Sequence, residues 1–306
     1  MIDFSKAEYK VPNPTLISGR TGYQYIYKGD KKDNIVDIAD GYFPSHPESA
    51  YIKTRDGNDE IFANLAGDTL IKAFIDSGDK NDEISIASDG DITVIGGNGD
   101  DTIHVETRNI TDPSPLHPPK IISGRYVNAG PGDDFIFTNE QFGNITPYRC
   151  GPGNDFFSAG DLAKSVRVWG EDGKDYLSGS NSDDLLMGGS EDDTITGSRG
   201  NDTLHGGESN DELEGSRGRD YLNGGSGNDM IKPGKGADIV HISIGDDIVK
   251  GLEPNKDKIL IDINLISGEL QYEPFQKGCY IKDGDQINSF FKKITAEQLK
   301  LMTDII

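Results

Sequence analysis

The segment Gly224-Gly225-Ser226-Gly227-Asn228-Asp229-Met230-Ile231-Lys232 decides the fold of this chain. Its first six residues are rich in glycine and end on a carboxylate, and its last three centre on the apolar residue Ile231. Glycine supplies the positive φ values of a tight turn. Three residues with an apolar one in the middle suit a short strand that buries one face. The segment therefore predicts a six-residue turn followed by a three-residue strand.

The same unit recurs every nine residues, and an apolar residue stands two positions after every aspartate of the series. The aspartates are Asp175, Asp184, Asp193, Asp202, Asp211, Asp220, Asp229, Asp238 and Asp247. The apolar residues are Leu177, Leu186, Ile195, Leu204, Leu213, Leu222, Ile231, Val240 and Val249. Because a fixed internal period is the signature of a solenoid, the series predicts stacked and nearly identical coils.

A second period of eighteen residues shows that two units form one coil. Gly-Gly pairs at 188, 206 and 224 alternate with Gly-Ser pairs at 179, 197 and 215. The solenoid should therefore have two distinguishable edges. One edge holds Asp175, Asp193, Asp211, Asp229 and Asp247, and the other holds Asp184, Asp202, Asp220 and Asp238.

The unit G-G-x-G-x-D-x-U-x, where U is a large apolar residue, resembles the calcium-binding nonapeptide of RTX (hemolysin-type) proteins. The resemblance is tight over residues 170–250 and implies an all-β fold, a right-handed parallel β-helix or β-roll solenoid with capping segments at both ends. It also implies a calcium ion between turns one full coil apart, which gives about seven ions over the four and three intervals of the two edges. Seven divalent ions would change the formal charge from −23 to −9.

Turn carbonyls and aspartates are the expected ligands, because calcium accepts six to eight oxygens in flexible geometry. Without cations, carboxylates stacked at a coil spacing of about 5 Å would repel one another. The ligand residues implied in the regular roll are Gly173, Asp175, Asp184, Gly189, Asp193, Gly200, Asp202, Gly207, Asp211, Gly218, Asp220, Gly225, Gly227, Asp229, Gly236, Asp238 and Asp247.

Looser copies of the unit reach back to about residue 28. Their anchors are Asp33, Asp59, Asp82, Asp101, Asp134 and Asp155, at intervals of 26, 23, 19, 33, 21 and, up to Asp175, 20 residues. Each anchor has an apolar residue two positions on, from Ile35 to Phe157. Each interval predicts one longer coil with a Gly-Asp turn on one edge only. We expect further calcium ligands at Asp82, Gly97, Gly99, Asp101, Gly132, Asp134, Gly153 and Asp155, whereas Asp33 and Asp59 lack parts of the motif.

The chain divides into three segments on this basis. Residues 1–169 should form an N-terminal cap, with Tyr23 to Tyr27 as its strand, and a long-coil parallel β-helix with calcium on one edge. Residues 170–250 should form the regular roll, and residues 251–306 a C-terminal cap. Within that cap we expect an apolar strand over 258–266 and a short helix over 294–302 that Thr295 caps. Four prolines between 107 and 123 predict a loop that bulges out of the solenoid.

Composition excludes several classes of protein. No run of 18 apolar residues exists, so we expect no transmembrane segment. Residues 1–10 lack a basic region followed by an apolar stretch, so we expect no Sec-type signal peptide. The charge of −23 argues against nucleic acid and anionic lipid as partners. Cys150 and Cys279 are too few and too far apart for a disulfide framework.

The chain ends Thr303-Asp304-Ile305-Ile306, which resembles the C-terminal export signal of RTX proteins that leave by type I secretion. The resemblance implies a bacterial protein that the type I secretion machinery exports, secreted or held at the cell surface, and that folds on meeting calcium outside. We expect a non-enzymatic structural, surface or matrix-associated module, with extracellular polysaccharide or the cell surface as a partner.

A polysaccharide lyase or epimerase, with its site on the N-terminal β-helix, is the alternative. No spacing links the residues available for catalysis, which are Tyr42, His46, His104, His117, Tyr126 and Arg149. The motifs Gly-x-Ser-x-Gly and His-Glu-x-x-His are absent, so lipase and zinc-protease chemistry is not expected. No amphipathic segment supports a membrane-active toxin.

Overall fold

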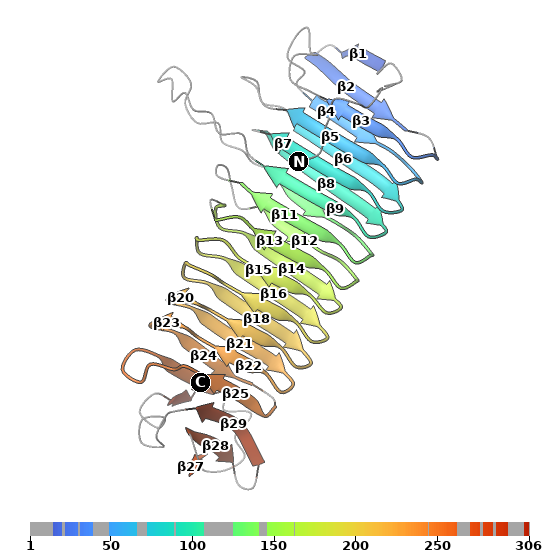
Figure 1. The fold of residues 1–306 in the computed structure, drawn as a ribbon. Coiled ribbons are helices and arrows are strands. Elements are labelled where there is room, and N and C mark those ends of the chain that lie inside the picture. Colours follow the sequence, from blue (N-terminus) through green and yellow to red (C-terminus); the bar gives the residue numbers. More distant parts are fainter. Residues whose placement is uncertain are drawn as a thin grey trace, which may run out of the picture.

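The computed structural model of the chain is a long stack of β-strands joined by turns (Figure 1). Strands are the only regular elements in the part of the chain that it describes. The structure describes residues 15–19, 22–29, 31–38, 49–65, 72–88, 90–106, 125–140, 146–161, 163–243, 245–261, 270–275, 278–283, 286–292 and 303–305. Within these ranges there is no helix of the length and apolar character that a membrane crossing requires.

Two sheets of 14 strands run the length of the described stack, and we name them sheet A and sheet B. Sheet A contains, in spatial order, β1 (Thr15–Gly19), β2 (Gly22–Lys28), β4 (Ser49–Lys53), β6 (Lys72–Asp79), β8 (Asp91–Asn98), β10 (Tyr126–Asn128), β12 (Pro147–Arg149), β14 (Arg167–Asp172), β16 (Leu185–Ser190), β18 (Thr203–Glu208), β21 (Tyr221–Ser226), β24 (Ile239–Ile242), β26 (Lys258–Ile261) and β30 (Thr303–Ile305).

Sheet B contains β3 (Ile35–Ile38), β5 (Glu60–Leu65), β7 (Glu83–Ser88), β9 (Thr102–Glu106), β11 (Phe135–Asn139), β13 (Phe156–Ala159), β15 (Tyr176–Ser178), β17 (Thr194–Thr196), β19 (Glu212–Glu214), β22 (Met230–Lys232), β25 (Asp247–Lys250), β29 (Gln286–Lys292), β28 (Gly278–Asp283) and β27 (Leu270–Phe275). From β3 to β26 the chain alternates between the sheets, apart from two short strands in the turns that form a third, two-stranded sheet. Each strand of sheets A and B pairs in parallel with the strand one coil away, as β17 does with β15 and β19. The expected all-β parallel solenoid is therefore confirmed.

The core follows from the two-residue period of a strand. Alternate residues of both sheets point inward and form one buried cluster, in which Leu177, Leu186, Ile195 and Leu204 are 0% exposed. Strands β4 to β9 are longer than the three-residue strands of the roll and bury two apolar residues each, as Ile103 and Val105 of β9 show. The regular roll buries one per short strand, so its core is thinner.

One sequence prediction is wrong at the N-terminal end. We expected Asp33 to anchor the first coil and Ile35 to point inward. The strand register pairs Val36 with Ile61, so Val36 is buried and Ile35 is 43% exposed. Asn34 thus occupies the anchor position. The sequence is ambiguous here because Asp33 and Asn34 each stand two residues before an apolar side chain.

Coil length changes along the stack. Equivalent anchors are separated by 25, 23, 19, 33, 21 and 20 residues down to Asp175, and by 18 thereafter. Both sheets continue across residues 169 and 250, where the coil type changes. The extra residues of long coils lie in the turns rather than in the ladder, since strands of long and short coils stay in register, as β13 does with β15.

Antiparallel strands close both ends of the stack. At the N-terminal end β1 pairs antiparallel with β2, which then begins the parallel part of sheet A. At the C-terminal end β27, β28 and β29 form an antiparallel meander that joins β25 through β29. The expected caps at both ends are confirmed, and β26 with β30 occupies the end of sheet A. The proline-rich loop of 107–123 and the helix of 294–302 lie outside the described residues.

Candidate metal centres

Each coil has two turns, which define two edges of the solenoid. We call the turn that leads into sheet B the first edge and the turn that leads into sheet A the second edge. Positive φ values occur at the second and fourth residues of a regular turn, as at Gly225 (106°) and Gly227 (131°). The motif departures Glu191 and Ser209 adopt the same region, at 72° and 80°. The backbone path of the turn is therefore retained where glycine is replaced.

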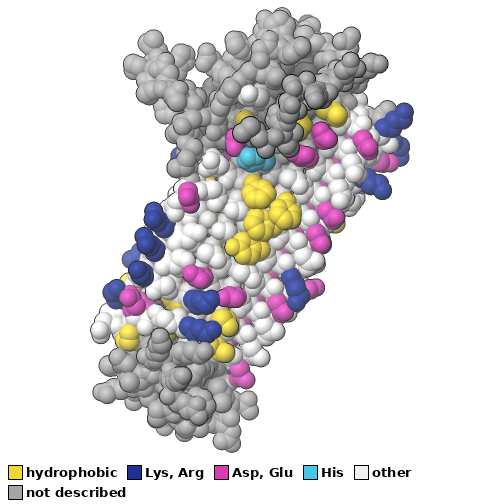
Figure 2. Space-filling view, in the orientation of Figure 1, with side chains coloured by type: hydrophobic (Ala, Val, Ile, Leu, Met, Phe, Trp, Pro, Cys, Tyr) yellow, Lys and Arg dark blue, Asp and Glu magenta, His cyan; other side chains and the backbone are white. Residues whose placement is uncertain are grey.

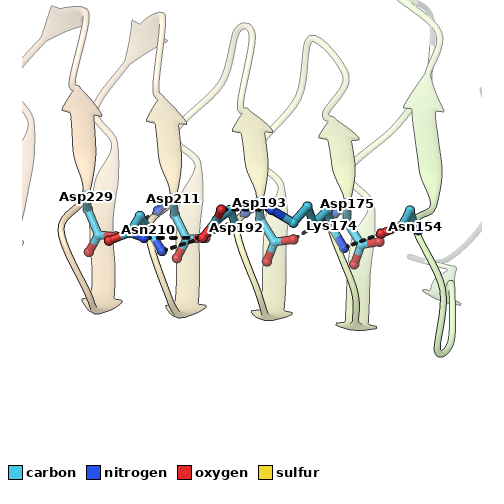
Figure 3. Close-up of polar contacts among 8 residues, drawn as sticks. All are labelled: Asn154, Lys174, Asp175, Asp192, Asp193, Asn210, Asp211 and Asp229. Atoms are coloured by element: carbon cyan, nitrogen blue, oxygen red, sulfur yellow. Dashed lines mark hydrogen bonds and ion pairs between the residues drawn. The ribbon is translucent and has the colours of Figure 1, made fainter.

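An inner ladder of aspartates links successive turns. The backbone N–H of Asp193 donates to Asp211 Oδ1 at 2.8 Å, and the N–H of Asp211 donates to Asp229 Oδ1 at 2.9 Å. Figure 3 shows these carboxylates side by side on consecutive coils of the first edge. The ladder extends along the first edge from Asn34 to Asp247 and along the second edge from Val166 to Asp257. One carboxylate oxygen of each aspartate is thus committed to the backbone of the previous coil.

The other oxygen of most ladder aspartates has no partner although it is buried. In the part of the chain that the structure describes, twelve Oδ2 atoms share this property. They belong to Asp59, Asp82, Asp101, Asp134, Asp155, Asp175, Asp193, Asp202, Asp211, Asp220, Asp229 and Asp238. A buried carboxylate oxygen without a hydrogen bond or cation is costly, so two parallel rows of such atoms require an explanation.

The space around each Oδ2 is lined with oxygen. A Cβ added to Gly206 would lie 2.2 Å from Asp211 Oδ2 and 2.4 Å from the carbonyl oxygen of Gly224, one coil on. Carboxylate and carbonyl oxygens of successive coils therefore converge on the glycine of the turn. Among the described residues, no three His, Cys, Asp or Glu side chains gather into one metal-binding group. Any cation here must take most of its ligands from backbone carbonyls, which suits calcium, a hard ion with oxygen ligands.

Burial gives these carboxylates an unusual affinity for protons. Desolvation is the main cause that raises the pKa of Asp211, Asp134 and Asp202 to about 8, and neighbouring ladder aspartates raise it further. Hydrogen bonds from the backbone N–H of the previous coil oppose the rise. The metal-free turn is therefore an electrostatically unfavourable place for negative charge, and a divalent cation would relieve it.

A second, outer ladder lies beside the first. The residue before each ladder aspartate is often Asn or Asp, and its Oδ1 accepts the N–H of the same turn position one coil on. Asn210 N donates to Asp192 Oδ1 at 3.1 Å, and Asn228 N donates to Asn210 Oδ1 at 2.8 Å. Lys174 continues this line through an ion pair with Asp192 at 2.9 Å (Figure 3). In the sequence, the signal for this outer ladder is the Asn or Asp at the position before each aspartate, which the nonapeptide pattern leaves variable.

The structure places all the sequence-predicted ligand residues in these turns. The predicted aspartates from Asp82 to Asp247 are buried members of the two ladders. The predicted glycines lie at turn positions with positive φ, namely Gly97, Gly99, Gly132, Gly153, Gly173, Gly189, Gly200, Gly207, Gly218, Gly225, Gly227 and Gly236. Gly218 shows why no side chain fits there, since an added Cβ would lie 1.4 Å from the carbonyl oxygen of Gly200.

Three ladder aspartates differ from the sequence expectation. Asp59, which lacks parts of the motif, still has a buried and unpaired Oδ2. Asp257, which no nonapeptide marks, extends the second edge by one step, but its Oδ2 accepts the N–H of Glu253 at 2.7 Å. Asp184 Oδ2 likewise accepts the N–H of Ser180 at 2.6 Å. These last two sites at the ends of the second edge have fewer free oxygens than the others.

Upstream of Val166 the second edge is closed by a different device. The Arg125 guanidinium, fully buried, donates to Glu140 Oε1 at 2.6 Å, to the carbonyl of Gly90 at 3.2 Å and to the carbonyl of Ser88. Glu140 also accepts a hydrogen bond from Thr146 Oγ1 at 2.7 Å. The guanidinium thus joins carbonyls of one coil to a carboxylate of another. A metal ion would join the same kinds of group in the Gly-Asp turns.

The residues considered for catalysis form no group of three in the described part of the chain. His104 lies on β9 of sheet B, whereas Tyr126 and Arg149 lie on the paired neighbouring strands β10 and β12 of sheet A. The Arg149 side chain is occupied by Glu171 and by the ring of Trp169. Tyr42, His46 and His117 lie outside the described residues. The described part of the upstream coils therefore assembles no catalytic group from this set.

Fold and site together define a class of protein, a parallel β-solenoid whose turns present stacked carboxylate and carbonyl oxygens to hard cations. Comparison with known families makes this specific. Residues 169–204 and 205–240 each match the RTX calcium-binding nonapeptide repeat (four copies). Residues 169–240 are thus RTX repeats, and the chain is a calcium-binding repeat protein. No curated protein matches the chain.

Proposed function

We propose that this protein is exported without calcium, folds when several calcium ions fill its two ladders outside the cell, and then acts as a structural module at a surface or in an extracellular matrix. The observation that carries the proposal is the set of twelve buried and unpaired Oδ2 atoms among the described residues. Bound water could donate hydrogen bonds to them, but only cations or protons would also neutralise the charge of the rows, and at neutral pH the millimolar calcium outside cells is the available cation of suitable chemistry.

Calcium would be held by the Asp carboxylates together with carbonyl oxygens of the turn glycines, and its chemical contribution is to neutralise the ladder charge. In the regular roll we assign this role to the predicted sites between Asp175 and Asp247 and between Asp184 and Asp238. Upstream we assign it to the first-edge turns at Asp82, Asp101, Asp134 and Asp155, and the unpaired Oδ2 of Asp59 favours one more.

Thermodynamic linkage between calcium binding and folding gives the size of the stabilisation. A ligand at a hundredfold excess over its Kd stabilises the folded state by about 2.7 kcal/mol per site. Several such sites equal or exceed the whole stability of an ordinary domain, about 5–15 kcal/mol. Because neighbouring turns share coil-to-coil hydrogen bonds, we expect calcium binding and folding to be cooperative. A chain that is unfolded at low calcium could pass through a type I export channel, which supports the proposed secretion.

Far-UV circular dichroism of the full chain, titrated with calcium after removal of metal, tests the proposal. We expect a steep rise in β-structure with calcium and none with magnesium, which demands stricter geometry and retains its water. Elemental analysis of the folded protein should give at least seven calcium ions per chain if the regular roll is filled. A chain that is equally folded in chelator would overturn the calcium-folding mechanism.

A further inference from the structure

The second edge of the regular roll carries a column of positive charge. Arg199, Arg217 and Lys235 occupy the third position of three successive turns, one coil apart, and all three are exposed. Arg219 lies beside them in the turn of Arg217. We call these four residues the basic column. Figure 2 shows Lys and Arg side chains along one edge of the solenoid, the edge where Figure 1 places β20 (Arg217–Gly218) and β23 (Lys235–Gly236).

Backbone pairing fixes the spacing of the column. β20 and β23 pair in parallel with Arg217 opposite Lys235, and an isolated bridge places Arg199 opposite Arg217. The N–H of Arg217 donates to the carbonyl of Ser198 at 3.0 Å, and that of Lys235 to Ser216 at 2.8 Å. The turns themselves therefore form a short third ladder, which holds the three side chains in register at the strand spacing of about 4.8 Å.

Within the described chain no side chain of the column forms an ion pair, although the Glu253 carboxylate lies near enough to Lys235 to interact with its charge. The same turn position on the first edge carries Asp172, Ser190, Glu208 and Ser226. At this position the first edge is therefore negatively charged and the second edge positively charged. Like charges stacked at this spacing repel. A chain with 53 acidic and 30 basic residues thus concentrates unpaired cations on one line of its surface.

We propose that the basic column binds a linear acidic polysaccharide, one whose sugar rings carry a carboxylate each, along the solenoid axis. A guanidinium pairs with a carboxylate through two parallel hydrogen bonds. Such a contact is therefore directional as well as electrostatic. A polyuronate presents one carboxylate per pyranose ring, so a single chain offers several carboxylates to the column. The proposal deepens the surface or matrix role above and rests on the calcium-folded state.

Nucleic acid fits the column less well. Each strand of a DNA duplex carries a phosphate about every 3.4 Å along the helix axis, which is out of register with a coil of about 4.8 Å. Outside the column the acidic surface would repel a dense polyanion longer than the column. A polyuronate has a lower charge density than a nucleic acid. A few of its sugar rings can bind along the column while the rest of its chain points away from the acidic surface.

Isothermal titration calorimetry of the calcium-loaded full chain with a short oligogalacturonate tests the proposal. The triple variant Arg199→Ala, Arg217→Ala, Lys235→Ala should lose about tenfold or more in affinity, since three charge-assisted contacts are removed. The control is Lys28→Ala, Arg55→Ala, Lys72→Ala, three exposed residues upstream that change net charge equally. The control should bind as the wild type does, and an uncharged oligosaccharide should not bind.

Equal loss in both triple variants would show a non-specific charge effect and overturn the proposal, as would tighter binding of a polyphosphate of the same length. Calcium titration by circular dichroism separates the two proposals. If the column variant folds with calcium like the wild type and still binds the probe, the column is wrong and the calcium mechanism stands. If the wild type folds in chelator, the calcium mechanism fails. The same comparison of binding by the wild type and the two triple variants, made in chelator, then tests the proposal for the basic column.

Discussion

Asp211 divides its carboxylate between two tasks. Its Oδ1 accepts the N–H of Asp193 at 2.8 Å, while its Oδ2 is buried, unpaired and close to the carbonyl of Gly224. Replacement by asparagine keeps an acceptor for the N–H but removes the charge, so it separates the hydrogen-bond ladder from the cation site.

We therefore expect Asp211→Asn to act differently in the two conditions. In chelator it should leave the residual β-structure unchanged or higher, because a carboxylate that is costly to bury has been removed. In calcium it should lower the free energy of unfolding by about 2–3 kcal/mol, the contribution of one occupied site. Far-UV circular dichroism in chelator and urea unfolding in calcium, at the same pH, measure the two effects. Asp183→Asn is the matched control, since Asp183 is exposed and accepts the N–H of Asn201 in the outer ladder. Destabilisation of Asp211→Asn in both conditions would contradict a cation site there.

The raised pKa values of the ladder aspartates predict how stability depends on pH. Burial raises the pKa of Asp82 and Asp220 to about 6 and that of Asp175 and Asp211 to about 8, against about 3.9 in an unfolded chain. A raised folded-state pKa means that the folded state binds protons more tightly than the unfolded state does. This tighter binding stabilises the folded state fully below about pH 4, and the stabilisation is lost as the pH rises through 6 to 8. Far-UV circular dichroism of the metal-free chain should therefore show more β-structure at pH 5 than at pH 8.

Calcium should reverse this dependence, because the ion competes with the protons for the same oxygens. With saturating calcium the Tm at pH 8 should be at least as high as at pH 5. Metal-free β-structure that increases between pH 5 and pH 8 would show that the ladder carboxylates are not desolvated in the folded state.

The sequence predicts the ladder positions well and their partners poorly. The nine-residue period places Asp193, Asp211 and Asp229 in equivalent turns, and the structure stacks them accordingly. The bond from each backbone N–H to the next carboxylate depends on the exact rotation of one coil against another, which no spacing encodes. The same dependence on register makes Asn34 rather than Asp33 the first anchor.

At the scale of elements, the upstream coils close their second edge with Arg125 instead of a Gly-Asp turn. The guanidinium contacts Ser88, Gly90 and Glu140, which belong to segments on either side of the undescribed residues 107–124. Sequence reasoning missed this element because Arg125 and Glu140 belong to no repeat, and two opposite charges 15 residues apart are not a signal by themselves.

We expect Arg125→Met to cost about 3–5 kcal/mol, because it leaves Glu140 buried without its counter-charge. The loss should be the same in calcium and in chelator, since the pair lies where the described second edge has no ladder aspartate. Urea unfolding with calcium, followed by a probe of the upstream coils, measures it.

Two further variants make the Arg125 prediction specific. Arg167→Met removes an exposed arginine at the start of β14 and should change the free energy of unfolding by no more than about 0.5 kcal/mol. The double variant Arg125→Met, Glu140→Met should recover part of the loss, because no lone charge remains. A cost that appears only in calcium would mean that the pair acts through the metal sites.

At the scale of the whole molecule, the interactions that hold neighbouring coils together change along the solenoid axis. Upstream coils bury two apolar side chains on a strand, as Ile84 and Ile86 of β7 do, and a buried aromatic pair, Tyr148 and Phe157, lies at 4.9 Å between ring centroids. In the regular roll the strands from β15 to β22 bury at most one apolar side chain each, and ladder aspartates lie on both edges. Hydrophobic burial therefore contributes more per coil upstream, and cation binding contributes more downstream.

This gradient predicts that calcium removal loosens the molecule from the regular roll outward. Hydrogen–deuterium exchange of the full chain at fixed pH, with calcium and with chelator, should show the largest loss of protection in β17, β19 and β22, where each coil has two ladder turns and a thin core. Strands β7, β9 and β13 should lose less, because their cores are thicker and, on the second edge, the Arg125–Glu140 pair needs no metal. The Arg125→Met variant provides the internal control, since it should erase the difference by exposing the upstream coils in both conditions. Uniform loss of protection along the whole stack would mean instead that both sheets unfold as one cooperative unit, and that the continuity of the two ladders outweighs the change in core thickness.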